Sequence, residues 1–419
     1  METKKPDAGD KVLTLPGLNT PGNRVQGVEF AGYMPVTGSA NPNGPRDGLF
    51  YWFAGTEDYA KRPLVIWTNG GPGSSSFWGF FLENGPYKIS FDDNGGFVLK
   101  PREFAWNQYA NYMIFEHPLS VTLSFAADED VPKTVEEGMG QYYQALLNFF
   151  VKHPELAKNP VILAGESYAG TYLPLLAKCI VDGNAKLPSD QQITLAATVL
   201  LDAWVNPEVQ MATDTTYAYY HGLISAAQKE LLDKTVPLTA VDDEIGNMSG
   251  VYMANIALPG DPPFDPVMKY LNDNDFRKAV NAPPVGEHTT VTQNWSPKVS
   301  ANYTPRVNES FAPLVQELLD DTDHNGSSKQ RIMVISGLND AKDCNFLGTE
   351  AWLNKLEGLS ASEFRMAGTT QWVDHENKRV IGFEQNGGRL SWLKVLNAGH
   401  LAVLDQPLLI HYILERAGV

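Results

Sequence analysis

Short apolar runs that recur along the chain constrain the fold more than any other feature. Six runs of four or five residues are bounded by turn-forming residues, and they begin at Leu64, Tyr112, Val161, Thr198, Ile332 and Trp392. Runs of this length are typical of strands that are buried on both faces of a sheet. Helical patterns lie between several of them, notably over 136–152 and 168–181. This alternation predicts an α/β fold with a mostly parallel central sheet flanked by helices.

The rhythm of strands and helices also suggests how the chain is divided. At ~150 residues per domain, 419 residues allow two or three domains, or one large domain with an insertion. Residues 1–25 are polar and read as an N-terminal tail. The alternation fails over 208–325, where Pro-, Gly- and Asn-rich chain separates helical patterns at 217–233, 276–280 and 311–320. We therefore expect an α/β core over 26–207 and 326–419, with 208–325 inserted as a mainly helical cap.

Composition excludes several classes of function. The formal net charge is −17, which argues against a nucleic-acid partner because phosphate binding needs a basic surface. No stretch of about 20 apolar residues predicts a membrane span. The two cysteines, Cys179 and Cys344, are too few for a disulfide scaffold or a cysteine-rich zinc site. We find no phosphate loop, nucleotide fingerprint or metal-ligand pattern, so no cofactor is expected.

The strongest local motif is Gly165-Glu-Ser-Tyr-Ala-Gly170, which directly follows a predicted strand. Small residues around a serine at a strand-to-helix turn are typical of a nucleophile elbow, because the sharp turn packs only with small neighbours. The plainer interpretation is that Ser167 caps the N-terminus of an ordinary helix. A nucleophile would require a base and an orienting acid elsewhere in the chain.

Candidates for both partners follow predicted strands in the order serine, acid, histidine. Asp340 lies on the loop after the run at 332–335, and His400 lies on the loop after the run at 392–396. Carboxyl ends of strands are where open α/β sheets carry their functional groups. The sequence predicts a catalytic triad of Ser167, Asp340 and His400, with Asp343 as the alternative acid.

An oxyanion site needs two rigid backbone N–H donors. The amide of Tyr168, which follows the serine, is one candidate. The Gly-rich segment 68–74, after the run that begins at Leu64, is expected to supply the other. The alternative interpretation of this segment is a simple turn, since Gly and Pro form turns in any context.

Taken together, these motifs resemble the serine carboxypeptidase family of the carboxypeptidase Y type, within the α/β-hydrolase fold. The resemblance runs in the family's order through nearly the whole chain, in the segments 67–75, 81–86, 106–107, 165–170, 344–348, 397–400 and 406–407.

The resemblance implies roles for residues outside the triad. It assigns the binding of a peptide's C-terminal carboxylate to Asn69, Gly70, Glu83 and Glu166, and the oxyanion donors to Gly71 and Tyr168. It also implies substrate-pocket positions for Trp78, Cys344 and Leu401. Two carboxyl groups beside a substrate carboxylate repel it unless at least one is protonated, so acidic pH should favour binding.

The chain departs from the family pattern at several places. Ser74 stands where the family usually has a cysteine in a disulfide, and the family's bridges are missing, so we expect packing alone to hold the cap. The loop 120–125 has lost two glycines that are typical of the family. The segment Leu200-Leu-Asp-Ala203 replaces an Ile-Gly-Asn-Gly pattern and introduces the carboxylate of Asp202 into a region that is usually neutral.

The expected function is a serine carboxypeptidase that acts through an acyl-enzyme and is favoured at acidic pH. The altered loops leave a second possibility, an acyltransferase or specialised hydrolase acting on a small-molecule ester or amide. A lyase or a binding protein is a third. The expected partner is a peptide or small-molecule acyl substrate, and the protein is expected to be a monomer or homodimer. The resemblance implies secretion or an acidic vacuole- or lysosome-like compartment.

Overall fold

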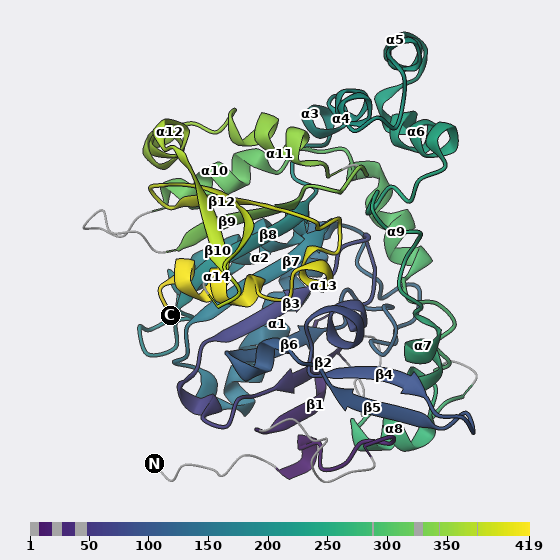
Figure 1. Cartoon of the computed structure of the whole chain (residues 1–419). Helices are drawn as coiled ribbons and strands as arrows, with labels where there is room; N and C mark the ends of the chain where they lie inside the picture. Colours follow the sequence, from purple (N-terminus) through teal and green to yellow (C-terminus); the bar gives the residue numbers. More distant parts are fainter. Residues whose placement is uncertain are drawn as a thin grey trace.

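A ten-stranded sheet runs through the molecule and carries helices on both faces (Figure 1). The structure is a computed structural model, and it describes residues 8–18, 27–37, 48–286, 289–321, 330–342, 344–374 and 376–419. Asp343, most of the segment 1–25 and the end of the segment 208–325 lie outside the described residues.

The middle of the sheet is parallel and its two edges are antiparallel. In spatial order the strands are β1 (Glu29–Met34), β2 (Leu49–Ala54), β6 (Asn111–Phe115), β3 (Leu64–Thr68), β7 (Val161–Ser167), β8 (Leu195–Ala203), β9 (Arg331–Gly337), β12 (Leu390–Val395), β11 (Arg379–Gly387) and β10 (Thr369–Asp374). A separate hairpin pairs β4 (Tyr87–Phe91) with β5 (Phe97–Pro101). The six apolar runs of the sequence are the six central parallel strands, so the predicted α/β-hydrolase fold is confirmed.

Two apolar cores explain why the central strands are apolar on both sides. Successive side chains of a strand point to opposite faces of the sheet. In β3, Leu64 and Ile66 pack into one core with α1 and α2, whereas Val65 and Trp67 pack into the other core with α14. The sheet is therefore covered on both faces.

The helices of the core and of the β8–β9 connection (residues 204–330) differ in length. The longest are α1 (Val135–Lys152) and α2 (Ala169–Asn184), which pack against each other on one face of the sheet. The others are α3 (Pro207–Met211), α4 (Asp214–Tyr220), α5 (Ala226–Thr235), α6 (Val241–Ser249), α7 (Asp265–Leu271), α8 (Asn274–Ala279), α9 (Pro297–Tyr303), α10 (Ala312–Asp320), α11 (Phe346–Leu353), α12 (Gly358–Met366), α13 (Ala402–Asp405) and α14 (Leu409–Ala417). No described helix is long and apolar enough to cross a membrane.

The helix predicted over 217–233 is two helices. Gly222, at φ +73°, turns the chain after α4, and Ser225 begins α5 with a capping box to Gln228. The pattern of apolar residues in α4 continues with the same helical spacing into α5. The sequence prediction therefore missed the break at Gly222.

The β8–β9 connection spreads over two sides of the sheet. Helices α3 to α6 lie together at the top of Figure 1, α9 runs down one side, and α7 and α8 lie near the hairpin β4–β5. The last helix, α10, packs back against α2.

Hydrogen bonds as well as packing hold this connection. Ser75 donates its N–H to Asn294 O (2.9 Å), and Ser296 donates its N–H to Gly73 O (2.9 Å). The hydroxyls of Ser120 and Ser296 lie 2.9 Å apart. The expectation that packing alone would hold the cap is wrong, because short backbone pairing joins it to the Gly-rich loop.

Candidate active site

Ser167 lies on a sharp turn between β7 and α2. It ends β7 at φ +60°, and α2 begins two residues later. The neighbouring glycines are required by space: a Cβ on Gly165 would lie 2.3 Å from Thr68 O, and one on Gly170 would lie 2.7 Å from Trp204 O. This is the geometry of a nucleophile elbow, in which a serine side chain projects from a strained backbone.

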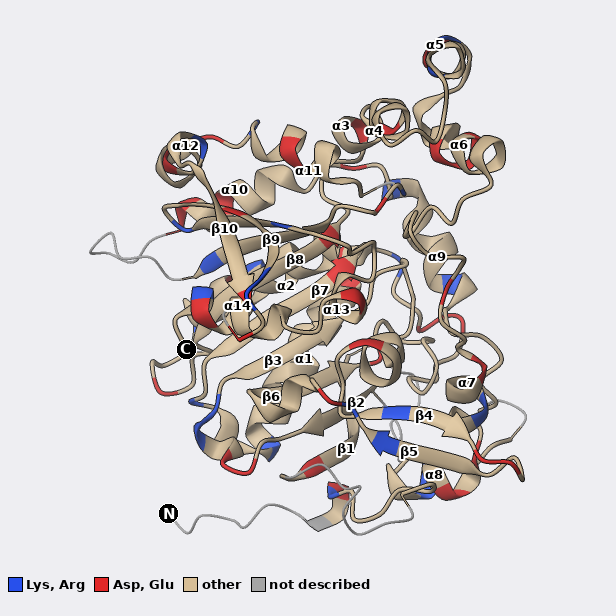
Figure 2. Cartoon of the chain, viewed as in Figure 1, with Lys and Arg blue, Asp and Glu red and all other residues tan. Residues whose placement is uncertain are grey.

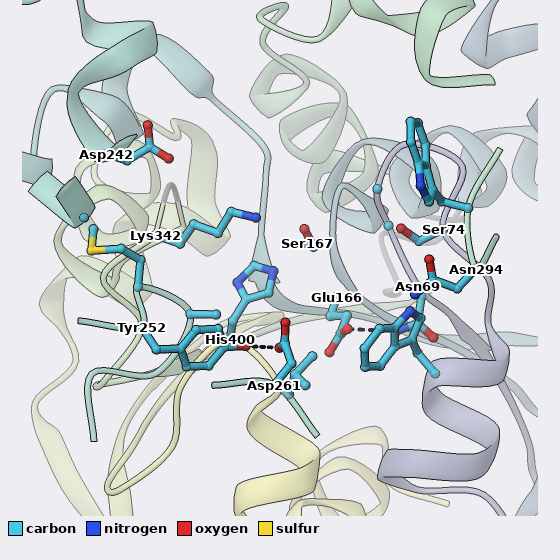
Figure 3. A pocket seen from close by; sticks show the side chains of 18 of the residues that line it. Asn69, Ser74, Glu166, Ser167, Asp242, Tyr252, Asp261, Asn294, Lys342 and His400 are labelled. Carbon is cyan, nitrogen blue, oxygen red and sulfur yellow. Dashed lines mark hydrogen bonds between the residues drawn. The ribbon is translucent and has the colours of Figure 1, made fainter. Parts of the chain in front are cut away.

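Asp340 and His400 form a buried pair beside Ser167. His400 Nδ1 lies 2.8 Å from Asp340 Oδ2, and Asp340 is fully buried. The second oxygen of Asp340 accepts the N–H of Lys342 at 2.9 Å. Because a carboxylate only accepts, the proton of a neutral His400 sits on Nδ1 and leaves the lone pair on Nε2. Figure 3 shows the imidazole pointing toward Ser167.

A cavity of about 590 Å³ brings most of the predicted site residues together. Ser167 and His400 line it, and so do predicted binding residues from the core, namely Asn69, Gly70, Gly71, Trp78, Glu166 and Leu401. The β8–β9 connection supplies further lining residues that the sequence analysis did not identify, including Asp242, Asp243, Tyr252, Asp261, Asn294 and Trp295. Lys342, two residues after Asp340, is another. The connection shows no regular pattern that would indicate which of its side chains face a cavity.

Asn69 connects the two buried glutamates at one end of this cavity. Its Nδ2 donates to Glu166 Oε1 at 2.8 Å and to Glu83 Oε1 at 3.2 Å. Its own Oδ1 accepts from Trp67 Nε1 (2.8 Å) and from the N–H of Gly79 (3.1 Å), which fixes the orientation of the amide. The Oε2 atoms of both glutamates are buried, and the two carboxyl groups share a side-chain hydrogen bond with each other.

Burial changes the titration of this pair. Removal from water raises the pKa of Glu83 to about 7. Burial, together with the charge of Glu83, raises the pKa of Glu166 well above its usual range. Two negative charges held together without water are costly, so the pair retains at least one proton under acidic and near-neutral conditions.

The Gly-rich loop reaches the elbow at close range. A Cβ on Gly70 would lie 2.3 Å from the N atom of Tyr168, so only glycine permits this approach. Gly71 has φ +109°. Neither Gly71 nor Tyr168 donates its N–H to another group in the part of the chain that the structure describes. Both amides are therefore available as donors beside the elbow.

Glu116 supports this loop from behind. Its Oε2 accepts from Ser75 Oγ at 2.7 Å and from the hydroxyl of Thr122. It is completely buried, and burial raises its pKa to about 7. Glu116 follows β6 at a strand end, which is the signal that identified Asp340 and His400 and that could have identified it too.

Four predicted residues do not line the cavity. Glu83 lies behind Asn69, Asp340 lies behind His400, and Tyr168 is nearly buried with its ring against Tyr172. The fourth, Cys344, is completely buried in the core. The two cysteines of the chain do not form a disulfide with each other.

Comparisons with known proteins point to one family. A profile described as "Serine carboxypeptidase" matches residues 16–254 and 259–417. "Venom serine carboxypeptidase" of Apis mellifera is 30% identical over 408 residues, which cover 90% of this chain and 81% of that protein. "Serine carboxypeptidase 3" of Hordeum vulgare is 28% identical, over 95% of this chain and 79% of that protein.

A solved structure agrees in fold. The prohormone-processing carboxypeptidase Kex1(delta)p from Saccharomyces cerevisiae superimposes with a TM-score of 0.79 at 20% sequence identity. The match covers 98% of this chain and 95% of that chain. At this level of identity the likeness shows the fold.

Proposed function

The chain belongs to the serine carboxypeptidase family, and on that premise we propose that it releases C-terminal residues from peptides through Ser167, His400 and Asp340. The chain is a serine hydrolase by family. The observation that carries the proposal is the buried set of Asn69, Glu83 and Glu166 at one end of the cavity that Ser167 and His400 line.

Acylation begins when Ser167 Oγ attacks the last peptide carbonyl. His400 Nε2 accepts the hydroxyl proton, and Asp340 orients the ring and stabilises the imidazolium that forms. The N–H groups of Gly71 and Tyr168 stabilise the oxyanion. His400 then gives the proton to the leaving amine, and the C-terminal residue departs.

Deacylation repeats these steps with water. His400 takes a proton from water, the hydroxide attacks the acyl-enzyme carbonyl, and the proton returns to Ser167. The shortened peptide leaves with a new free carboxylate.

Carboxylate recognition depends on the protonated glutamate pair. Asn69 Nδ2 is a donor, and a protonated Glu83 or Glu166 supplies an O–H donor to the substrate carboxylate. When pH rises through the pKa of Glu83, about 7, the pair gains charge and repels the substrate. We therefore expect the enzyme to work best at acidic pH, which supports secretion or an acidic compartment as its location.

We also propose that residues 208–325 form a cap over a core of 26–207 and 326–419. Its support is that Asp242, Tyr252 and Trp295, all from this segment, line the cavity. Trp78 packs its ring 4.5 Å from Phe264 of the same segment, so the cap shapes the region for the substrate's last residue.

No observation favours the acyltransferase alternative. Its sequence support was the altered loops 120–125 and 200–204, and none of these residues, all of which the structure describes, lines the cavity. The loop 120–125 contacts the surroundings of the cavity only indirectly, through Ser120 with Ser296 and Thr122 with Glu116.

The test compares two assays. One measures release of the last residue from a panel of N-blocked dipeptides, and the other measures acyl transfer from an activated ester to small-molecule acceptors. We expect release of the last residue at acidic pH, abolished in Ser167→Ala. Transfer to an acceptor with no peptide release, while a fluorophosphonate still labels Ser167, would contradict the proposal and favour acyl transfer.

A further inference from the structure

A second buried carboxyl group lies behind the pair of Asp340 and His400. Asp202, next to last in β8, has φ +38° and is completely buried. Its Oδ1 accepts the N–H of Gly337 at 2.7 Å. Its Oδ2 is buried and has no hydrogen-bond partner among the described residues.

Gly337 joins Asp202 to the two loops of the proposed triad. It ends β9, and its carbonyl accepts the N–H of Asp340 at 3.3 Å. A Cβ on Gly337 would lie 2.2 Å from Gly399 O, so this glycine also packs against the residue before His400. Through its hydrogen bond to Gly337, Asp202 therefore supports the point at which the loop of Asp340 meets the loop of His400, here called the histidine loop.

The groups that act electrostatically on Asp202, or on which it acts, come from four elements. They are Asp340 after β9, Asp405 in α13, Glu166 in β7 and Tyr217 in α4. Figure 2 shows the acidic segments gathered where the central strands end beside α13. All four neighbours are acids or a phenol, and none neutralises a negative charge on Asp202.

When two neighbouring carboxyl groups are both buried away from solvent, ionising both of them costs a large free energy. Asp340 has His400 as a partner and accepts two hydrogen bonds, so it is the group that carries the charge. Burial first, and then the charge of Asp340, raises the pKa of Asp202 well above its usual range. A neutral carboxyl fits the contacts, since its carbonyl oxygen accepts from Gly337 and its proton occupies Oδ2.

We propose that Asp202 is a positioning residue that stays protonated in the folded enzyme, so that Asp340 alone carries the negative charge beneath His400. A second anion there would stabilise the imidazolium and keep His400 protonated to higher pH. A protonated His400 cannot act as the base that accepts the proton of Ser167. This inference rests on the proposed triad for its catalytic meaning, but its protonation state can be measured without any substrate.

Unfolding equilibria of the wild type and Asp202→Asn test the protonation state. The amide mimics a neutral carboxyl and carries no charge in either state. Unfolded Asp202 ionises above about pH 4 while the folded residue does not, so the wild type loses stability as pH rises. The ratio of the wild-type to the variant unfolding constant should increase about tenfold per pH unit above about pH 4. A flat ratio would overturn the proposal.

Asp202→Gly is the second variant, because glycine adopts the positive φ without strain. It removes the same carboxyl, so the same slope is expected from it even if the asparagine variant does not fold.

Kinetics test the positioning role. Asp202→Gly loses the hydrogen bond to Gly337, so we expect kcat to fall with KM little changed, and Asp202→Asn to restore most of the loss at pH 5. If Asp202→Asn were as inactive as Asp340→Asn, Asp202 would be a charged partner of His400 and the proposal would be wrong. Failure of the proposed function is distinct, since the wild type would then release no C-terminal residue from any dipeptide while the unfolding ratio kept its slope.

Discussion

Ala254 accepts the backbone N–H of His400 at 2.7 Å, so the β8–β9 connection itself holds the histidine loop. The preceding carbonyl, of Met253, accepts the N–H of Ala341 at 2.9 Å, directly after Asp340. One short segment of the β8–β9 connection thus contacts both loops of the proposed triad. The match to the family profile is interrupted right after this segment, between residues 254 and 259.

Asn255 is the first residue of that interruption, and it is expected to matter for catalysis. Its Nδ2 donates to Asp405 Oδ2 at 2.9 Å, and the same oxygen accepts the N–H of Gly399 at 2.9 Å. Asn255→Ala should cost about 1–3 kcal/mol of unfolding free energy and lower kcat by about tenfold or more, because the histidine loop loses a support. Chemical unfolding and steady-state kinetics measure both. Equal effects from Asn354→Ala, at an exposed site, would contradict this role.

Glycine-to-alanine changes at the elbow and at an exposed helical position should change the stability of the fold in opposite directions. Gly170→Ala places a methyl group 2.7 Å from Trp204 O and should destabilise the fold by about 1–3 kcal/mol. Gly140→Ala, at an exposed position of α1 with no atom within 4 Å of its Cβ, should stabilise the fold by about 0.5–1 kcal/mol. Thermal unfolding compares them, and equal shifts in Tm would show that the turn has room for a side chain.

The identity of the acid can be tested by two substitutions close in sequence. Asp340→Asn should reduce kcat by about 10⁴-fold, because an asparagine holds His400 in the wrong tautomer. Asp343→Asn, at the alternative acid, should leave kcat unchanged. A large loss from the second substitution and none from the first would move the acid role to Asp343.

Glu116 should make stability depend on pH. Its pKa is about 7 in the folded chain, against about 4.3 when unfolded. The unfolded state therefore releases a proton first, and stability falls as pH rises from about 4.3 to about 7 and is level above that. Glu116→Gln should remove a cost on the order of 2–4 kcal/mol at pH 8 and little at pH 4. Urea unfolding measures the difference, with the exposed Glu103→Gln as control, and a variant less stable than the wild type at pH 8 would contradict the assignment.

The centre of the fold was predictable because its signals are local and strong. Strands buried on both faces need unbroken apolar runs, as in β3 and β7. Ser167, Asp340 and His400 were predicted as site residues because each lies at the end of such a strand or just after it. The antiparallel edge strands β10 and β11 were missed. They are partly exposed and mix polar with apolar residues, so no single period stands out. Strand β2 was also omitted from the sequence prediction, although it is an unbroken apolar run like the strands that were predicted.

Residues that depend on tertiary contacts could not be predicted. Asp405 and Asn255 come from segments without periodic pattern, and they meet only because the β8–β9 connection crosses the end of the sheet. Tyr252 and Asp261 are hydrogen-bonded to each other within the β8–β9 connection, and nothing in their local sequence indicates a cavity wall. The absence of the family's disulfide bridges was recognised from the sequence, but the backbone pairing that joins the β8–β9 connection to the Gly-rich loop was not predicted.

The most direct test of the central claim is the selectivity for a free C-terminus, given as the ratio of kcat/KM for an N-blocked dipeptide to that for its amide. At pH 5 we predict a large ratio for the wild type, which falls as pH rises through about 7 and is lost at every pH in Asn69→Ala. An equal preference for acid and amide at pH 5, with Ser167→Ala inactive on both, would contradict carboxylate recognition by Asn69, Glu83 and Glu166.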